Sequence, residues 1–156
     1  MRHPERELKS EETIKAILER SHVGRMATVN PEGFPVIKPV NYLYRDKKIY
    51  VHSSQKGEKV DDIRRGSLVC FEVDDPIAYV AAAGSPCGAN YYYRSIIIKG
   101  RAALLEDRHQ KVKVLEKLME KYQPEGGYGA VPEEILEKTA VIEIFADEIT
   151  GKEKLR

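Results

Sequence analysis

The sequence has no tryptophan, two cysteines, no long apolar run and almost no net charge, and each shortage excludes a class of protein. Lys and Arg number 26 against 25 for Asp and Glu, which argues against a dedicated nucleic-acid binder because such proteins need a basic face. Cys70 and Cys87 cannot form a disulfide framework. The charged start (MRHPERELKSEET) lacks the apolar region of a signal peptide, and no stretch is long enough to span a bilayer. We therefore expect a cytoplasmic protein that binds neither nucleic acid nor membrane.

The hydrophobic pattern predicts one domain, residues 1–156, built mainly from strands with peripheral helices. We predict an N-terminal segment and helix in 1–23, the main barrel strands in 24–105, helices in 107–138 and a final strand at 139–152. Strands that follow one another directly favour an antiparallel sheet over alternating strands and helices. The expected fold is a six-stranded antiparallel Greek-key barrel.

Some segments carry more specific expectations. Residues 34–44 (FPVIKPVNYLY) are predicted to form one long strand, and its two prolines place it at a sheet edge or a bulge. Gly100 interrupts another long strand, residues 92–105, and predicts a bulge or sharp bend there. Residues 74–90 show no clear periodicity, and we treat them as an excursion without an assigned structure.

The stretch HSSQKGEKVDDIRR (52–65) follows a short strand and leads into a predicted helix. Gly57 allows close approach of a ligand to the backbone, Lys56 and Lys59 supply positive charge, and Ser53 supplies a hydroxyl donor. This composition suits a phosphate site. It is also typical of a solvated helix start, and the local pattern alone favours that second interpretation.

Two more segments have both a functional and a structural interpretation. In VIKPVNY, Pro39 interrupts the ladder of hydrogen bonds, so that backbone groups near it and Asn41 can face a planar heterocycle. The same features, with the charge of Lys38, also protect an ordinary edge strand. In YYYRSIII, Arg94 and Ser95 can bind an anion or lie at a subunit interface beside the tyrosines.

His52 is a candidate proton donor, cofactor contact or metal ligand, although a lone histidine at a strand end is more often structural. The other three histidines lack a carboxylate-rich partner motif, so we expect no metal site.

Taken in order, the segments G-R-x-A-T-V, P-V-N, Y-x-H-S, G-x-K, V-C-F-E-V and Y-R-S resemble the pyridoxamine 5′-phosphate oxidase-related flavin-binding split barrels. The resemblance covers about residues 10–152 and is strongest to the branch that contains nitroimidazole-resistance reductases and flavin-nucleotide-binding proteins. It implies a split barrel that binds FMN at the interface of a homodimer. The cofactor-binding residues that it implies are Lys38, Pro39, Val40, Asn41, Val51, His52, Ser53, Lys56, Gly57, Lys59, Arg94 and Ser95.

Within that set, the resemblance assigns roles. Residues 38–41 run along the isoalloxazine and the flavin side chain, and residues 51–53 line the cofactor. Lys56, Gly57 and Lys59 hold the phosphate, while Arg94 and Ser95 complete the pocket, in the homodimer from the partner subunit. The cradle interpretation of residues 52–65 is thereby favoured.

The resemblance implies an FMN-dependent oxidoreductase that reduces a small molecule such as a nitroaromatic with electrons from a nicotinamide. No side chain is an obvious acid or base, and His52 is the best catalytic candidate. Vitamin B6 oxidation is not expected, because the chain has no tryptophan and lacks the serine–arginine–lysine cluster of the oxidase proper. Two alternatives are a flavin-binding protein without turnover and a haem-binding barrel with His52 as axial ligand.

Overall fold

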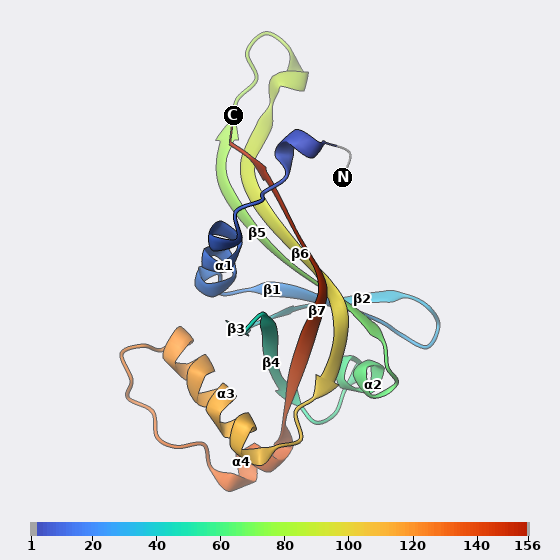
Figure 1. The fold of residues 1–156 in the computed structure, drawn as a ribbon, viewed down its shortest axis with the longest axis vertical. Helices are drawn as coiled ribbons and strands as arrows, with labels where there is room; N and C mark the ends of the chain where they lie inside the picture. Colours follow the sequence, from blue (N-terminus) through green and yellow to red (C-terminus); the bar gives the residue numbers. More distant parts are fainter. Residues whose placement is uncertain (1–2, 156) are drawn as a thin grey trace.

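The computed structural model describes residues 3–155, which contain seven strands, four α-helices and two 3₁₀-helices (Figure 1). The strands are β1 (Gly24–Val29), β2 (Pro35–Val40), β3 (Leu43–Arg45), β4 (Lys48–Ser54), β5 (Leu68–Val80), β6 (Asn90–Leu104) and β7 (Thr139–Lys154). The α-helices are α1 (Glu11–Arg20), α2 (Glu58–Arg64), α3 (Arg108–Tyr122) and α4 (Glu133–Lys138), and the 3₁₀-helices are η1 (Pro4–Arg6) and η2 (Pro86–Gly88). The mainly β fold with peripheral helices is confirmed, but the sheet has seven strands and not six.

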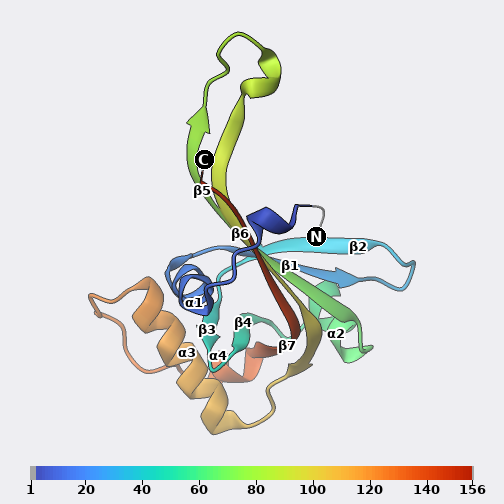
Figure 2. The same cartoon turned by 45° about the horizontal axis from the view of Figure 1, so that its top comes forward.

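All seven strands belong to one antiparallel sheet with the order β2-β1-β5-β6-β7-β4-β3. Strands β2 and β3 are its two edges, yet only Asn41 and Tyr42 separate them along the chain. The two edges must therefore meet at these residues, which requires the sheet to curl into a barrel that stays open along one line (Figures 1 and 2). We call this line the seam. The edge position predicted for the proline-containing strand β2 is confirmed.

The prediction of one strand over residues 34–44 was wrong, because the chain leaves the sheet at the seam to bury an aromatic ring. The Tyr42 side chain is completely buried, and its hydroxyl donates to the Leu18 carbonyl at 2.7 Å. Its ring meets Phe71 edge-on, with 4.9 Å between centroids. The Tyr42 backbone N–H donates to the Tyr122 hydroxyl at 2.8 Å and not to a neighbouring strand. Residues of the peripheral helices α1 and α3 thus anchor Tyr42 at the seam.

Residues 74–90 form a regular structure that the sequence pattern did not reveal. Strands β5 and β6 continue past the barrel as a two-stranded hairpin, with a register shift between Pro76 and Ala78 that absorbs the proline. Over residues 76–92, β5 and β6 pair with each other, and no other strand of the described residues pairs with them there. We call residues 76–92 the arm; it projects beyond the barrel in both views (Figures 1 and 2).

The bulge predicted at Gly100 is confirmed, since the β6–β7 register shifts between Lys99 and Gly100. A Cβ atom at Gly100 would lie 1.8 Å from the carbonyl oxygen of Phe145. Only glycine lets the two backbones approach this closely, and the bulge bends β6 within the part that pairs with β7.

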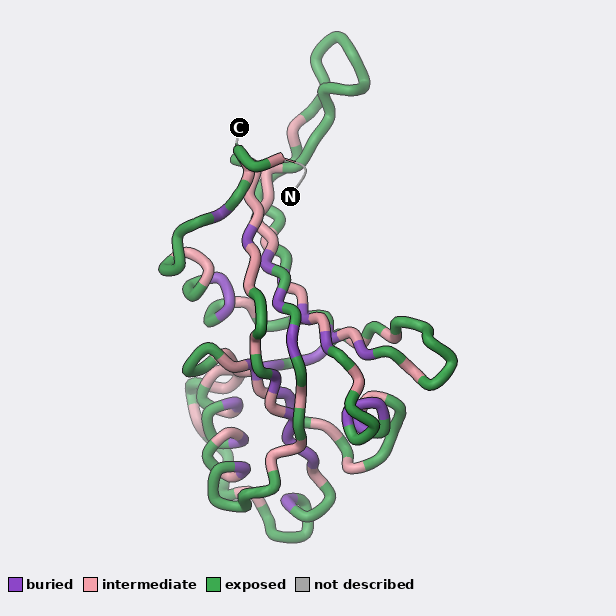
Figure 3. Tube along the Cα trace, turned by 45° about the vertical axis from the view of Figure 1, so that its right-hand side comes forward, coloured by how far each residue is buried: buried purple, intermediate pink, exposed green. Residues whose placement is uncertain are grey.

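Buried residues concentrate where the strands of the barrel cross, whereas the arm is largely exposed (Figure 3). Ile17 and Leu18 of α1 are fully buried in the main core, and the Ser10 hydroxyl caps this helix by accepting from the Thr13 N–H at 3.1 Å. A second cluster, made by α3, α4 and the start of β7, packs beneath the other end of the barrel.

Candidate functional site

The loop between β4 and α2 is shaped by one glycine. Gly57 has φ +120°, a backbone conformation that L side chains rarely adopt, and its carbonyl accepts from the Val60 and Asp61 N–H groups at 2.9 and 3.0 Å. A Cβ atom at Gly57 would meet no atom within 4 Å. The space over Gly57 is therefore open, and the backbone here is accessible to a ligand.

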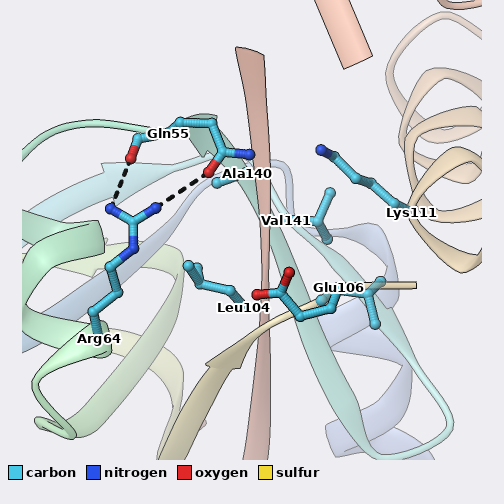
Figure 4. Close-up of a pocket in the computed structure, with 8 residues that line it drawn as sticks. Gln55, Arg64, Leu104, Glu106, Lys111, Ala140 and Val141 are labelled. Atoms are coloured by element: carbon cyan, nitrogen blue, oxygen red, sulfur yellow. Dashed lines mark hydrogen bonds between the residues drawn. The ribbon is translucent and has the colours of Figure 1, made fainter. Parts of the chain in front are cut away.

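Gln55 and Arg64 hold this loop in place, and sequence reasoning missed both residues. The Gln55 N–H donates to the Lys138 carbonyl at 3.2 Å, and its side-chain amide donates to the Thr139 carbonyl at 3.1 Å. From the other side, the Arg64 guanidinium donates to the Gln55 carbonyl at 3.0 Å and to its Oε1 at 3.3 Å (Figure 4). We call this set of hydrogen bonds the Gln55 clamp. Because it joins positions far apart in the chain, no local sequence pattern could indicate it.

Three basic side chains from three different elements are coupled electrostatically beside the loop. Burial and the nearby charge of Lys38 lower the pKa of Lys59, while burial and the charge of Lys59 lower the pKa of His52. Lys38 lies on β2, His52 on β4 and Lys59 on α2. The Glu58 carboxylate is 3.1 Å from the Lys38 ammonium group and only partly balances the cluster. The site is therefore a local concentration of positive charge across the seam.

The other residues predicted in this region fall into two groups. Pro39, Asn41 and Lys56 are exposed, and Ser53 is half-buried. Val40 and Val51 point into the barrel, where they are 8% and 0% exposed and belong to the main core. The two valine side chains therefore pack in the core beneath the site.

Within one chain, Arg94 and Ser95 are not brought to the basic cluster. Arg94 pairs with Glu153 on β7, and its guanidinium is 3.1 Å from that carboxylate. His52 pairs with Val141 on the same strand, which corresponds to roughly 40 Å of extended chain between the two positions. Any shared ligand would have to receive Arg94 and Ser95 from another copy.

Neither described cavity contains the basic cluster. A cavity of about 170 Å³ lies behind the Gln55 clamp (Figure 4), and a larger one of about 710 Å³ lies between α1, the β3–β4 turn and β7. The cluster faces open solvent, so a flat ligand there is covered only if a second surface closes over it. Residues 3–155 contain no group of His, Cys, Asp or Glu side chains arranged to hold a metal ion. No described helix combines the length and the apolarity that crossing a membrane requires.

The fold and the sequence identify the family. The family described as Pyridoxamine 5′-phosphate oxidase matches residues 10–153, so this chain belongs to that family. The match spans nearly the whole barrel and agrees with the resemblance seen in the sequence. No curated protein sequence matches the chain.

Several solved structures share the fold at low sequence identity. A protein of Bacteroides thetaiotaomicron assigned to 5-nitroimidazole antibiotic resistance aligns with a TM-score of 0.81 and 21% identity, over 94% of this chain and 85% of that one. The flavocytochrome Anf3 of Azotobacter vinelandii aligns with a TM-score of 0.89 and 24% identity, over 100% and 72% of the two chains. An FAD and heme binding protein of Mycobacterium smegmatis gives 0.87 and 18%, over 97% and 74%.

Proposed function

We propose that this protein is an FMN-binding flavoprotein that transfers electrons from a nicotinamide to a small acceptor such as a nitroaromatic compound. The observation that carries the proposal is the meeting of Lys38, His52 and Lys59 beside the open Gly57 loop, in a chain of the pyridoxamine 5′-phosphate oxidase family. The similar structure assigned to 5-nitroimidazole resistance supports the class of acceptor.

The residues present fit a flavin phosphate. A phosphate dianion needs donors and positive charge, and the loop offers Lys56, Lys59 and the open backbone at Gly57. The Gln55 clamp fixes the loop before any ligand arrives, so little ordering is required on binding. Burial and, after it, the charge of Lys38 lower the pKa of Lys59, and a bound phosphate would offset the repulsion between these two lysines.

Bound FMN supplies the hydride and electron chemistry, and the chain supplies binding, orientation and electrostatics. Burial and the charge of Lys59 lower the pKa of His52 and so favour the neutral imidazole, which both donates and accepts hydrogen bonds. We therefore assign His52 a polar contact to the flavin or the acceptor. The two free cysteines suit a reducing compartment, and we place the protein in the cytoplasm.

We further propose that the working form is a homodimer. The basic cluster lies on an open face, and Arg94 and Ser95 cannot reach it within one chain. A two-fold dimer supplies both the missing cover and these two residues from the partner subunit.

The test compares FMN with riboflavin, which lacks the phosphate. We expect Lys56→Ala/Lys59→Ala to weaken FMN binding by about a hundredfold or more, because each charge-assisted hydrogen bond contributes about 1.5–3 kcal/mol. Riboflavin binding should change little. The matched control, Lys113→Ala/Lys117→Ala, removes two exposed lysines from α3 and should bind FMN normally. Equal FMN affinity in all three proteins, measured by fluorescence titration, would place the phosphate elsewhere.

Haem binding is a second candidate, favoured by the neutral imidazole of His52 and by the similarity to a flavocytochrome and to an FAD and heme binding protein. The absorbance spectrum of the purified protein separates the two: flavin bands support the first proposal and a haem band supports the second. For a flavin-loaded protein, repeated oxidation of nicotinamide by an added nitroaromatic distinguishes an enzyme from a flavin-binding protein without turnover.

A further inference from the structure

The arm contains no charged residue, in a chain of which 33% of the residues are charged. Its sequence, PIAYVAAAGSPCGANYY, is entirely apolar, small or uncharged polar. A segment that stands in water normally carries charges that keep it soluble and unpaired. The composition of the arm is that of a buried surface.

The arm is nevertheless exposed. Ile77, Tyr79 and Tyr91 are 47%, 62% and 52% exposed, and the two tyrosine rings lie side by side with 5.5 Å between centroids. A two-stranded hairpin without a third strand or a packed face is only marginally stable in water. The arm therefore requires a covering surface that one copy of the chain does not provide (Figures 1 and 2).

The same chain carries a second uncovered apolar surface. Val29 and Leu68 are neighbours on β1 and β5, and Ile37 of β2 points to the same side of the sheet; they are 41%, 67% and 63% exposed. Phe34, in the β1–β2 turn, is 67% exposed. We call these four residues the β1–β2 patch. It continues along the exposed face of β2 to Pro39, beside the seam.

These observations indicate which kind of partner covers the arm and the β1–β2 patch. An arm without any cation does not suit nucleic acid or an anionic membrane surface, both of which recruit basic residues. In a two-fold dimer, the arm of each copy can cover the uncovered apolar face of the other copy, so that both apolar surfaces of both chains are buried. The arm extends roughly 25 Å beyond the barrel, which is enough to cross the outer face of a neighbouring sheet.

We propose that the arm of each copy docks on the β1–β2 patch of a second copy and closes over its seam. The docking itself needs only the two surfaces, whereas its effect on the cofactor rests on the proposed FMN site. The docked arm carries Tyr79 and Tyr91 and so covers the open side of the seam with uncharged aromatic surface.

Cross-linking tests the contact directly, because Cys87 lies in the connection at the end of the arm. In a Cys70→Ala background, Ile37→Cys and Phe34→Cys each place a thiol on the patch. Treatment with a flexible bis-maleimide should give covalent dimers that disappear when Cys87→Ala is added. The control, Ile135→Cys on α4, is 52% exposed and should give none. Failure of both patch variants to exceed this control overturns the docking.

A second measurement uses Tyr79→Ser/Tyr91→Ser, with Tyr128→Ser as the control because Tyr128 is also exposed but lies in another loop. We expect the arm variant to raise the dimer dissociation constant at least about tenfold in sedimentation experiments, since buried aromatic residues dominate interfaces. FMN and riboflavin affinity should fall together, unlike in the lysine variants. A circular dichroism spectrum identical to that of the native protein shows that the fold is intact.

The outcomes separate the two proposals. If the arm variant dissociates the dimer but the native protein retains no flavin, the docking stands and the proposed function fails. If the native protein is a flavin-loaded dimer and the arm variant is unchanged, the docking fails alone. A native protein that is monomeric overturns the docking.

Discussion

At the scale of single residues, the clearest requirements concern glycines. Gly57 and Gly100 are both irreplaceable, but for different physical reasons. Gly57 is needed for its positive φ in an open loop, whereas Gly100 is needed because the Phe145 carbonyl occupies the space of a side chain. The first requirement concerns the candidate site and the second concerns the barrel. A substitution at Gly57 should therefore act mainly on ligand binding, and one at Gly100 mainly on the free energy of unfolding.

We predict that Gly100→Ala lowers the free energy of unfolding by about 3 kcal/mol, because its new methyl group collides with backbone that cannot move without breaking the β6–β7 ladder. Gly129→Ala is the control: a methyl group there meets no atom within 4 Å. Urea denaturation of both variants gives the two values. Equal stability of the two variants would show that the bulge relaxes without cost.

At the scale of elements, the strands, the edge position of β2 and the Gly100 bulge could be predicted because alternation, proline and glycine act locally. The split at Tyr42 could not, because it depends on Leu18 and Tyr122, which are distant in the chain. The arm also lacks local signals, since its small and apolar residues do not alternate. In the candidate site, the loop residues are predicted from the sequence alone, whereas the Gln55 clamp could not be predicted because it forms only when β7 pairs with β4.

The clamp gives a prediction about the loop between β4 and α2. Arg64→Met removes two hydrogen bonds to Gln55 without touching the predicted phosphate ligands, so FMN affinity should fall about tenfold with little change in thermal stability. Arg64→Lys, which keeps one donor, should be intermediate. Arg108→Met is the control, since Arg108 pairs on the surface with Glu133. Isothermal titration of the three variants measures the effect; an Arg64→Met protein with native affinity would show that the loop holds its shape unaided.

At the scale of the whole molecule, Lys121 joins parts that are remote in sequence. Its ammonium group donates to the Ser21 and Tyr42 carbonyls at 2.7 and 3.1 Å and lies 4.0 Å from the centre of the Tyr42 ring. It thus ties α3 to the end of α1 and to the seam. Burial nevertheless lowers the pKa of Lys121 to about 8.

This shift predicts how stability depends on pH. The folded pKa of Lys121 is lower than the unfolded value near 10.5, so the unfolded chain binds this proton more readily. The free energy of unfolding should therefore rise as the pH increases from about 8 to 10. The range ends there because the raised pKa of Tyr42 acts in the opposite direction at higher pH. In Lys121→Met, the free energy of unfolding should rise less steeply with pH. Lys59, whose pKa is also lowered, is present in both proteins, so its contribution cancels in the comparison. Parallel slopes in urea titrations would contradict this assignment.

The pairing of β4 with β7 also determines when the candidate site can exist. Lys138 and Thr139, which hold Gln55, are about eighty residues further along the chain, and no earlier segment substitutes for them. A ribosome has to release nearly the entire barrel before the β4–α2 loop acquires its final shape. We therefore predict that the proposed FMN binds only after synthesis of β7, and that a nascent chain truncated before this strand retains no flavin.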